Sequence, residues 1–485
     1  MSETLFHYDA TYEMQDNDLL VFPYRGEELP LFNGESCPAV ITDTLLVSDD
    51  QGGRRCCFAG ILNGNRIAAE TVRLDARDVS PEQQMKSAVS SAITRAEKEF
   101  AGARVVVFLS EAGRELFTAV QEGAILGGYR FDRYLEKKSK NIKVFLVTSS
   151  EEPEMTKSLA SHNNTVFEQV NSARDILNEP PNVIHPESLA EYFSVHGGRA
   201  GLDMEIWDET RLRDERCGGI IAVGQGAESR PRLVVGRWRS GKAKRRIALV
   251  GKGVTCDTGG YCLKPGPSQV GMKYDMGGAA MMFASACAAA LLGLPLDITL
   301  FAPLVENDIS GNAFHATDII TMRSGKTVQV DNTDAEGRLI LADALALASE
   351  EKPDIIIDAA TLTGACVVAL GEDIAGLFSR DKELGENLLK AGLDTGEWLW
   401  PMPLHMPYME QLKTEIADCR NLGDKWGGAV TAALFLGQFV PEEIPWAHID
   451  IAGPSVKEEP LGHLGKGAKG FGVKTMVRFM SGLAD

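Results

Sequence analysis

The sequence lacks the signatures of several common protein classes. Its nine cysteines include no pair at CxxC spacing, and only Cys56 and Cys57 are adjacent. Because neighbouring cysteines rarely reach the geometry of a disulfide bond, reduced thiols are expected. The HExxH motif of many zinc proteases, low-complexity tracts and internal repeats are also missing. These absences argue against a disulfide-stabilised scaffold, an HExxH enzyme and a repeat protein.

Positive charge is also in short supply. The 485 residues include 49 Lys and Arg against 68 Asp and Glu, which gives a formal net charge of -19. A field of that sign repels phosphate groups, so it disfavours non-specific binding to nucleic acid or to anionic lipid. This net charge is more compatible with small, diffusible substrates than with nucleic acid or membranes.

A signal peptide is not indicated, because the opening residues are acidic and lack a basic start followed by an apolar run. One uncharged stretch, Met276 to Leu296, is long enough to cross a bilayer. It is bounded by Asp275 and Asp297 rather than by basic or aromatic anchors, so a buried helix is expected instead. The sequence therefore predicts a cytoplasmic protein without a membrane partner.

Hydrophobic periodicity divides the chain into two α/β domains. Residues 1–150 alternate strand-like runs such as Arg104–Leu109 with helix-like runs such as Pro81–Phe100, which predicts a small N-terminal α/β domain. A helix-like stretch over 151–178 ends at two prolines. We expect this helix to link the first domain to a larger second domain over 179–485.

The second domain repeats the order of apolar strand, Gly-rich turn and helix. Apolar, β-branched strands separated by helix-length segments predict a mostly parallel sheet covered by helices on both faces. Ligands gather at the carboxyl ends of the strands in such sheets. Polar clusters follow four of the predicted strands, which are Arg246–Val250, Ile298–Leu304, Thr327–Val330 and Ile355–Asp358.

Four carboxylates lie in otherwise apolar, Gly- and Ala-rich segments of this domain: Asp257, Asp275, Asp334 and Glu336. Buried carboxylates are unfavourable unless they are paired or bind a metal, so together they indicate a shared cation. Helix capping or a surface loop would explain any one of them alone. In an extended segment, Asp334 and Glu336 would face the same way, and Arg338 would share that face.

The ligand type favours a pair of divalent ions. Carboxylate oxygens suit Mg, Mn or Zn, and four or more anionic ligands balance the charge of two ions better than that of one. A water molecule that bridges two such ions has a pKa near neutrality, so it would supply hydroxide to attack a carbonyl group.

Three of these segments resemble the leucyl (cytosol) aminopeptidases. They are NTDAEGRL at 332–339, VGKGVTCDTGG at 250–260 and MKYDMGGAA at 272–280. Further similarity, in NEPPN, AVGQGA, DAATLTGA, GGAVTAA and HIDIAG, extends the resemblance over about residues 165–480. The resemblance implies that residues 179–485 form a catalytic domain in which two metal ions remove N-terminal residues from peptides, with Leu and other apolar residues preferred.

The resemblance also implies a role for each matching metal ligand. Asp257 and Glu336 would bridge both ions, and Asp334 would bind the more exchangeable ion. Asp275 and Lys252 would bind the tighter one. An amine binds metal only when it is deprotonated, so the pKa of Lys252 would have to be lowered by burial and by the ions themselves.

Two further cations match catalytic positions of the family. Lys264 would stabilise the oxyanion of the tetrahedral intermediate, and Arg338 would hold a bicarbonate ion that acts as general base. From its carboxylate neighbours alone, Arg338 could equally form a structural salt bridge. Met272 and Thr361 would line the pocket for the N-terminal side chain, although Met272 could instead be an ordinary core residue. The peptide main chain would be bound by Asn332, Thr361, Leu362 and Gly364.

Other functions stay open beside this one. The same site would serve a narrower dipeptidase, such as one that hydrolyses Cys-Gly, and the residues do not rank the two substrates. Some family members also bind DNA, but a net charge of -19 without a basic stripe predicts no nucleic-acid partner. A scaffold without metal is disfavoured because every ligand position is present.

The resemblance finally implies a homohexamer of two trimers, with catalytic domains inside and N-terminal domains outside. The apolar run Ala429–Val440, beside Trp426, would suit such an interface because a monomer would have to cover it itself. Helices that are apolar all round are also typical of a protein core. The run is therefore either an interface or a core helix.

Overall fold

The computed structural model describes residues 6–9, 13, 15–24, 31–32, 35–36, 57–62, 65–74, 79–99, 104–109, 115–140, 142–148, 153–460 and 462–484. Cys56 and most of the opening residues discussed for a signal peptide lie outside these ranges. The chain divides into two compact units, Met1–Asn171 with Glu458–Gly467 and Ser172–Lys457 with Ala468–Asp485. The boundary falls inside helix α4 (Pro153–Asn178).

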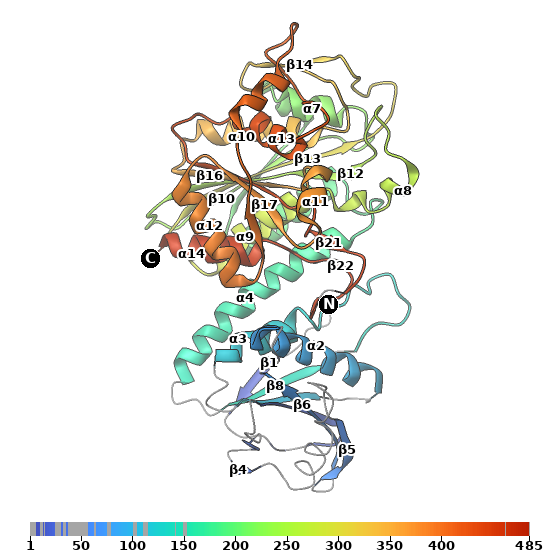
Figure 1. Ribbon diagram of the computed structural model, residues 1–485, viewed down its shortest axis with the longest axis vertical. Coiled ribbons are helices and arrows are strands. Elements are labelled where there is room, and N and C mark those ends of the chain that lie inside the picture. The colour runs from blue at the N-terminus through green and yellow to red at the C-terminus, as the bar shows by residue number, and fades with distance from the viewer. Residues whose placement is uncertain are drawn as a thin grey trace. The chain divides into compact units, whose positions relative to one another are not determined.

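The first unit contains a six-stranded sheet with helices α2 (Pro81–Glu99) and α3 (Phe117–Ile125) against it (Figure 1). Its strands, in spatial order, are β1 (Phe6–Asp9), β8 (Lys143–Thr148), β7 (Arg104–Leu109), β2 (Asp18–Tyr24), β6 (Asn65–Arg73) and β5 (Cys57–Leu62). The pairing of β5 with β6 is antiparallel, and the other pairings are parallel. A short hairpin of β3 (Leu31–Phe32) and β4 (Glu35–Ser36) completes the described strands. The predicted N-terminal α/β domain is therefore confirmed.

The second unit is built on a nine-stranded sheet. In spatial order its strands are β18 (Leu399–Pro401), β17 (Ala375–Ser379), β20 (Trp446–Asp450), β16 (Ile355–Ala360), β11 (Arg246–Gly251), β13 (Asp297–Asn307), β10 (Arg232–Arg239) and β9 (Asp203–Trp207), with β12 (Gly253–Asp257) beside β13. The central strands β20, β16, β11 and β13 are parallel. They are almost fully buried, which is why their sequences are predominantly apolar.

Two layers of helices enclose this sheet (Figure 1). Helices α5 (Pro186–Ala200), α9 (Gly277–Leu291), α12 (Lys382–Thr395) and α14 (Val473–Ala484) form one layer, and α7 (Gly218–Gly224), α10 (Gly337–Glu350) and α13 (Gly428–Gly437) form the other. The remaining elements are α6 (Glu209–Asp214), α8 (Gly266–Gln269), η3 (Met272–Tyr274), α11 (Gly364–Leu370), η4 (Met406–Leu412), β14 (Ile319–Thr321), β15 (Thr327–Gln329), β19 (Cys419–Arg420), β21 (Val456–Lys457) and β22 (Gly467–Ala468). The parallel-rich sheet with helices on both faces was predicted from the sequence.

The two long apolar runs are both core helices. Residues Gly277–Ala290 of α9 are all buried, so the uncharged stretch is a helix of the protein interior. No helix in the described part of the chain combines the length and hydropathy that a bilayer crossing needs. The run Ala429–Val440 is α13 and the turn after it, and its side chains belong to the core of the second unit. The chain itself therefore covers most of this run, as expected for a core helix.

Candidate metal centre

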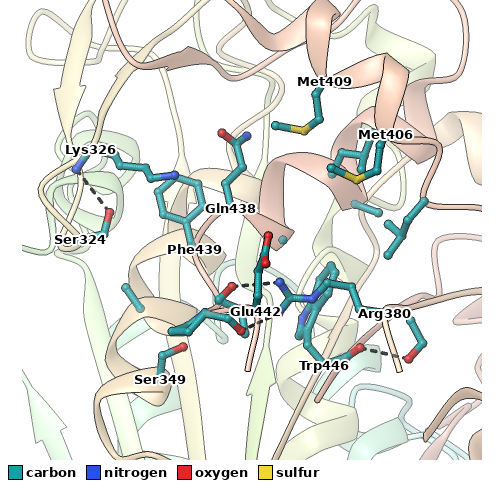
Figure 2. A pocket seen from close by; sticks show the side chains of 18 of the residues that line it. Ser324, Lys326, Ser349, Arg380, Met406, Met409, Gln438, Phe439, Glu442 and Trp446 are labelled. Carbon is teal, nitrogen blue, oxygen red and sulfur yellow. Dashed lines mark hydrogen bonds between the residues drawn. The ribbon is translucent and has the colours of Figure 1, made fainter. Parts of the chain in front are cut away.

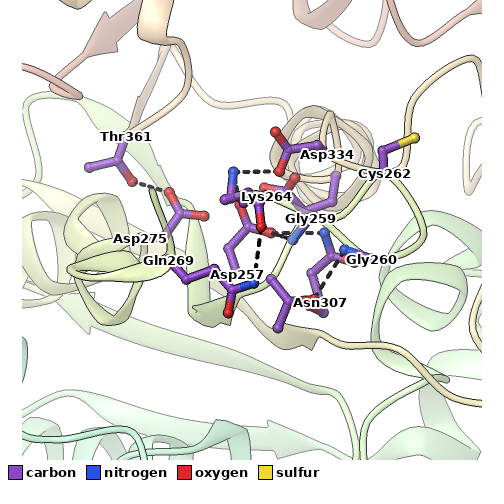
Figure 3. A network of polar contacts seen from close by, with 12 residues as sticks. Asp257, Gly259, Gly260, Cys262, Lys264, Gln269, Asp275, Asn307, Asp334 and Thr361 are labelled. Carbon is purple, nitrogen blue, oxygen red and sulfur yellow. Dashed lines mark hydrogen bonds and ion pairs between the residues drawn. The ribbon is translucent and has the colours of Figure 1, made fainter. Parts of the chain in front are cut away.

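Part of the predicted site lies at the carboxyl ends of strands in the second sheet (Figure 3). Lys252 follows β11, and Asp257 ends β12. Asp275 lies between η3 and α9, and Thr361 follows β16. β11 and β16 are each paired with a strand on both sides, and β12 is paired with β13, so the residues at their ends project from a fixed edge of the sheet.

The segment that carries Asp334 and Glu336 is a turn, so the expectation of an extended segment is wrong. The Asn332 side chain accepts a hydrogen bond from the main-chain N–H of Asp334 at 2.8 Å, a local bond that favours a turn. Glu336 has helical angles (φ -76°, ψ -37°) because α10 begins at the next residue. The turn still brings both carboxylates to Asp257, and one oxygen atom of each of the three lies within 4.8 Å of the others.

Lys252 connects the fourth carboxylate to this group. Its Nζ lies 2.7 Å from Oδ2 of Asp275 and 2.9 Å from Oε1 of Glu336, and it donates a hydrogen bond to the carbonyl of Thr361 at 3.1 Å. Burial lowers the pKa of Lys252, but the carboxylates of Asp275 and Glu336 outweigh burial and raise it. With carboxylates alone as neighbours, Lys252 is therefore an ammonium group, and the expected lowering of its pKa depends on bound ions.

Lys264 reaches the same cluster from the loop after β12 (Figure 3). Its Nζ lies 2.8 Å from Oδ2 of Asp257 and also contacts Asp334. Gly259 and Gly260 have φ angles of +88° and +61°, and a Cβ atom at Gly259 would lie 2.9 Å from the Asp334 carboxylate. Glycine at these two positions lets the loop turn back and place Lys264 over the carboxylates.

The electrostatics of the cluster favour a bound cation. Burial raises the pKa of Asp275, Asp334 and Glu336, and repulsion from the neighbouring Asp257 raises each of them further. Oε2 of Glu336 and Oδ1 of Asn307 are buried and have no hydrogen-bond partner within the described residues. Buried acceptors without a donor are rare, and a hard divalent ion takes oxygen ligands of this kind. The residues present therefore fit the metal ions that the resemblance implies.

Arg338 lies in the first turn of α10 and is 5% exposed. Its Nη1 donates a hydrogen bond to the carbonyl of Asn421 at 2.7 Å, and its buried Nε has no hydrogen-bond partner among the residues that the structure describes. Burial lowers its pKa to about 10. None of the described carboxylates forms an ion pair with it, so the alternative of a structural salt bridge is not what the structure shows. A buried guanidinium group with a free N–H suits a small anion.

Two of the residues expected to bind peptide make hydrogen bonds to carboxylates. Thr361 donates a hydrogen bond from Oγ1 to Asp275 at 2.7 Å, and the main-chain N–H of Leu362 donates to Asp450 at 3.2 Å. Gly364 begins α11 and is exposed. Met272 begins η3 and is half-buried, as Asn332 and Leu362 are, so it is not a core residue of the kind found in α9.

Sequence reasoning missed two residues that hold the ligands in place. Asn307, fully buried at the end of β13, donates hydrogen bonds to Oδ1 of Asp257 at 2.9 Å and to the carbonyl of Thr333 at 3.0 Å. Its place after a predicted strand was the available signal. Asn421 bonds the turn that carries Asp334, and no local pattern marks it.

A separate cavity of about 1210 Å³ lies at the other end of α10 (Figure 2). Its lining includes Glu350, Arg380, Phe439 and Trp446. Arg380 donates a hydrogen bond there to the carbonyl of Val440 at 3.1 Å. The carboxylate cluster stands at the opposite, N-terminal end of α10, so this cavity is not the metal centre.

Comparison of the sequence with known proteins finds cytosol aminopeptidases. The profile of the cytosol aminopeptidase family, catalytic domain, matches residues 171–477. A probable cytosol aminopeptidase of Streptomyces avermitilis is 43% identical over 400 residues, which cover 81% of this chain and 78% of that protein. One from Aquifex aeolicus is 39% identical over 417 residues, with 84% and 83% covered.

Solved structures extend the similarity to the whole chain. A mutant of tomato leucine aminopeptidase superposes with a TM-score of 0.85 at 30% identity, covering 99% of this chain and 96% of that one. The bottromycin maturation enzyme BotP in complex with Mn gives a TM-score of 0.85 at 29% identity, covering 97% and 100%.

Proposed function

We propose that this chain, which belongs to the cytosol aminopeptidase family and is therefore an aminopeptidase, removes apolar N-terminal residues from peptides at the carboxylate cluster. The observation that carries the proposal is the convergence of Asp257, Asp334 and Glu336 within 4.8 Å, with Asp275 joined to them through Lys252. Buried carboxylates in such a set are unfavourable unless cations are paired with them or bound by them.

Asp257 and Glu336 would hold both ions, Asp334 would hold one, and Asp275 with Lys252 would hold the other. When bound, the ions supply an acidic water molecule and a Lewis acid for the substrate carbonyl. We propose Mn or Zn as the resident metal, with Mg as a third possibility, since oxygen ligands accept all three. The structurally similar BotP was solved with Mn, which supports Mn.

Lys264 and Arg338 would provide the positive charges of the reaction. The Nζ atom of Lys264 lies over the carboxylates, where it would bind the oxyanion that develops on the substrate carbonyl. Arg338 offers its buried, unpartnered Nε to an anion, and we propose bicarbonate as that anion. Bicarbonate would supply a base at this position.

Substrate binding would use the half-buried residues around the cluster. Met272 and Thr361 would contact the N-terminal side chain, and an apolar Met suits Leu or Met there. The groups around the peptide main chain would be Asn332, Thr361, Leu362 and Gly364. We also propose that the protein acts in the cytoplasm, as the names of its relatives suggest.

The test is a metal analysis combined with a substrate panel. We expect two divalent ions per chain and hydrolysis of Leu-amide and Met-amide. Acetylation of the substrate amine should remove activity, because only a free, neutral amine can bind an ion. Hydrolysis of Cys-Gly without Leu-amide would establish the narrower dipeptidase, and efficient cleavage of acetyl-Leu-amide would contradict the proposal.

A further inference from the structure

One buried side chain, Asn421, lies between the ligand-bearing turn and Arg338. Asn421 follows β19 and is 0% exposed. Its main-chain N–H donates to the carbonyl of Gln329 at 3.0 Å, which continues the pairing of β19 with β15. This pairing carries Asn421 to a turn that lies 86 to 90 residues earlier in the chain.

The side-chain amide of Asn421 spans that turn. Its Oδ1 accepts hydrogen bonds from the main-chain N–H groups of Asp331 at 2.8 Å and Asn332 at 3.3 Å. Its Nδ2 donates to the carbonyls of Asn332 at 2.7 Å and Ala335 at 3.3 Å. A primary amide offers two acceptor sites and two N–H groups, so its full capacity is used. Both ends of the turn that carries Asp334 are thereby fixed.

The main chain of Asn421 also holds Arg338. Its carbonyl accepts from Nη1 of Arg338 at 2.7 Å, which is the one hydrogen bond that the guanidinium group makes to any described residue. Arg338 lies in the first turn of α10, the helix that follows Glu336. The same residue therefore fixes the turn before the helix and the cation in the helix's first turn.

We propose that Asn421 is a positioning residue of the aminopeptidase, which sets the spacing between the carboxylates of Asp334 and Glu336 and the guanidinium group of Arg338. The inference rests on the proposed function. Asn421 acts on the substrate and the ions only through these three side chains. Removal of such an outer partner typically reduces metal affinity or activity by about 10–100-fold.

The first test compares Asn421→Ala with Asn163→Ala. Asn163 is also a buried amide (6% exposed), and it donates to Thr118 at 3.1 Å and Gln121 at 3.0 Å in the first unit. In calorimetric titrations of chelator-treated protein, Asn421→Ala should bind Mn²⁺ about 10–100-fold more weakly than wild type. Asn163→Ala should bind Mn²⁺ as wild type does, although both variants should melt at a lower temperature than wild type.

A second variant guards against a folding failure. Asn421→Ser keeps a hydroxyl that can make part of these hydrogen bonds, so its Mn²⁺ affinity and kcat should lie between those of Asn421→Ala and wild type. Wild-type Mn²⁺ affinity and kcat in both Asn421 variants would overturn the inference. Failure of the wild-type protein itself to bind Mn²⁺ or to hydrolyse Leu-amide would instead overturn the proposed function.

A double-mutant cycle tests the link to Arg338. If Asn421 acts partly through the guanidinium group, the loss of kcat in the double variant Asn421→Ala with Arg338→Ala should be smaller than the product of the two single losses. In the double variant Asn163→Ala with Arg338→Ala, the loss of kcat should equal the product of the two single losses. A full product for the Asn421 pair as well would overturn the part of the inference that concerns Arg338.

Discussion

Glu336 is the residue on which the two-metal assignment depends most. One of its oxygen atoms lies 2.9 Å from Nζ of Lys252, and the other is buried without a hydrogen-bond partner. Glu336→Ala should therefore abolish hydrolysis and lower the bound metal, and Asp257→Ala should do the same. Elemental analysis beside a Leu-amide assay checks both. Glu350→Ala, at the exposed end of the same helix, should change neither quantity. Full metal content and turnover in the Glu336 and Asp257 variants would refute the assignment.

Lys264 and Lys252 both contact carboxylates, yet we expect their variants to differ. Lys264→Ala should lose turnover by about 10²–10³ while it retains metal, because a removed oxyanion donor affects the transition state. Lys252→Ala should lose metal, since Lys252 joins Asp275 to Glu336. Metal stoichiometry measured beside kinetics separates the two. Metal loss in the Lys264 variant would show that the two roles are exchanged.

Some site residues can be predicted from the sequence around them, and others depend on residues far away in the chain. The clustering of Asp257 and Asp275 near other charged groups was predictable, because carboxylates among glycines and alanines need a counterion. The shape of the turn at Asp334 was not predicted, since spacing alone cannot distinguish a turn from an extended segment. Asn421 was unpredictable for a different reason, because its partners lie 86 to 90 residues away and only the pairing of β19 with β15 brings them together.

At the scale of elements, α9 is fixed by a close approach to the sheet. A Cβ atom at Gly278 would lie 2.0 Å from the carbonyl oxygen of Ala359 and 2.9 Å from the main-chain nitrogen of Lys252. The start of α9 therefore touches the ends of β16 and β11, and this contact places Asp275 next to Lys252. Gly278 of the MKYDMGGAA segment is thus required by packing against the sheet.

Gly278→Ala should separate the start of α9 from the sheet. Overpacking of this kind costs about 1–3 kcal/mol of unfolding free energy, and the displaced Asp275 should weaken metal binding as well. Gly198→Ala in α5 is the matched control, because a Cβ atom there meets nothing within 4 Å. It should be neutral or stabilise the protein by up to about 1 kcal/mol. Denaturant unfolding measures the free energy of unfolding of both variants. Equal values for the two would contradict the packing argument.

At the scale of the whole molecule, strand runs and helix lengths were enough to predict the fold class. The parallel centre of the second sheet was predicted from its predominantly apolar strands. The antiparallel pairings of β10 with β13 and β9, and of β17 with β20, were not predicted, because a short apolar run does not show the direction of its strand. Nor was the return of Glu458–Gly467 to the first unit, because its partners there are distant in sequence: Ser90, which donates to the carbonyl of His463, lies 373 residues earlier.

The last prediction concerns assembly, for which we propose a homohexamer. Because α13 is mostly covered by its own chain, we place the proposed interface at exposed apolar side chains elsewhere in the second unit. Trp398, Trp400, Met406 and Trp426 are 53%, 54%, 63% and 73% exposed. Large exposed apolar side chains mark interaction sites, and closed symmetry is the common arrangement of soluble homo-oligomers.

Light scattering after size exclusion should therefore give six times the 52.5 kDa of one chain. Trp426→Asp should lower that mass at dilute concentration, because it places a charge on the proposed interface. Tyr134→Asp, at a position 57% exposed in the first unit, should not, since the N-terminal domains would lie outside the assembly. A wild-type particle with the mass of one chain that hydrolyses Leu-amide at full rate would refute the hexamer and leave the chemistry of the carboxylate cluster intact.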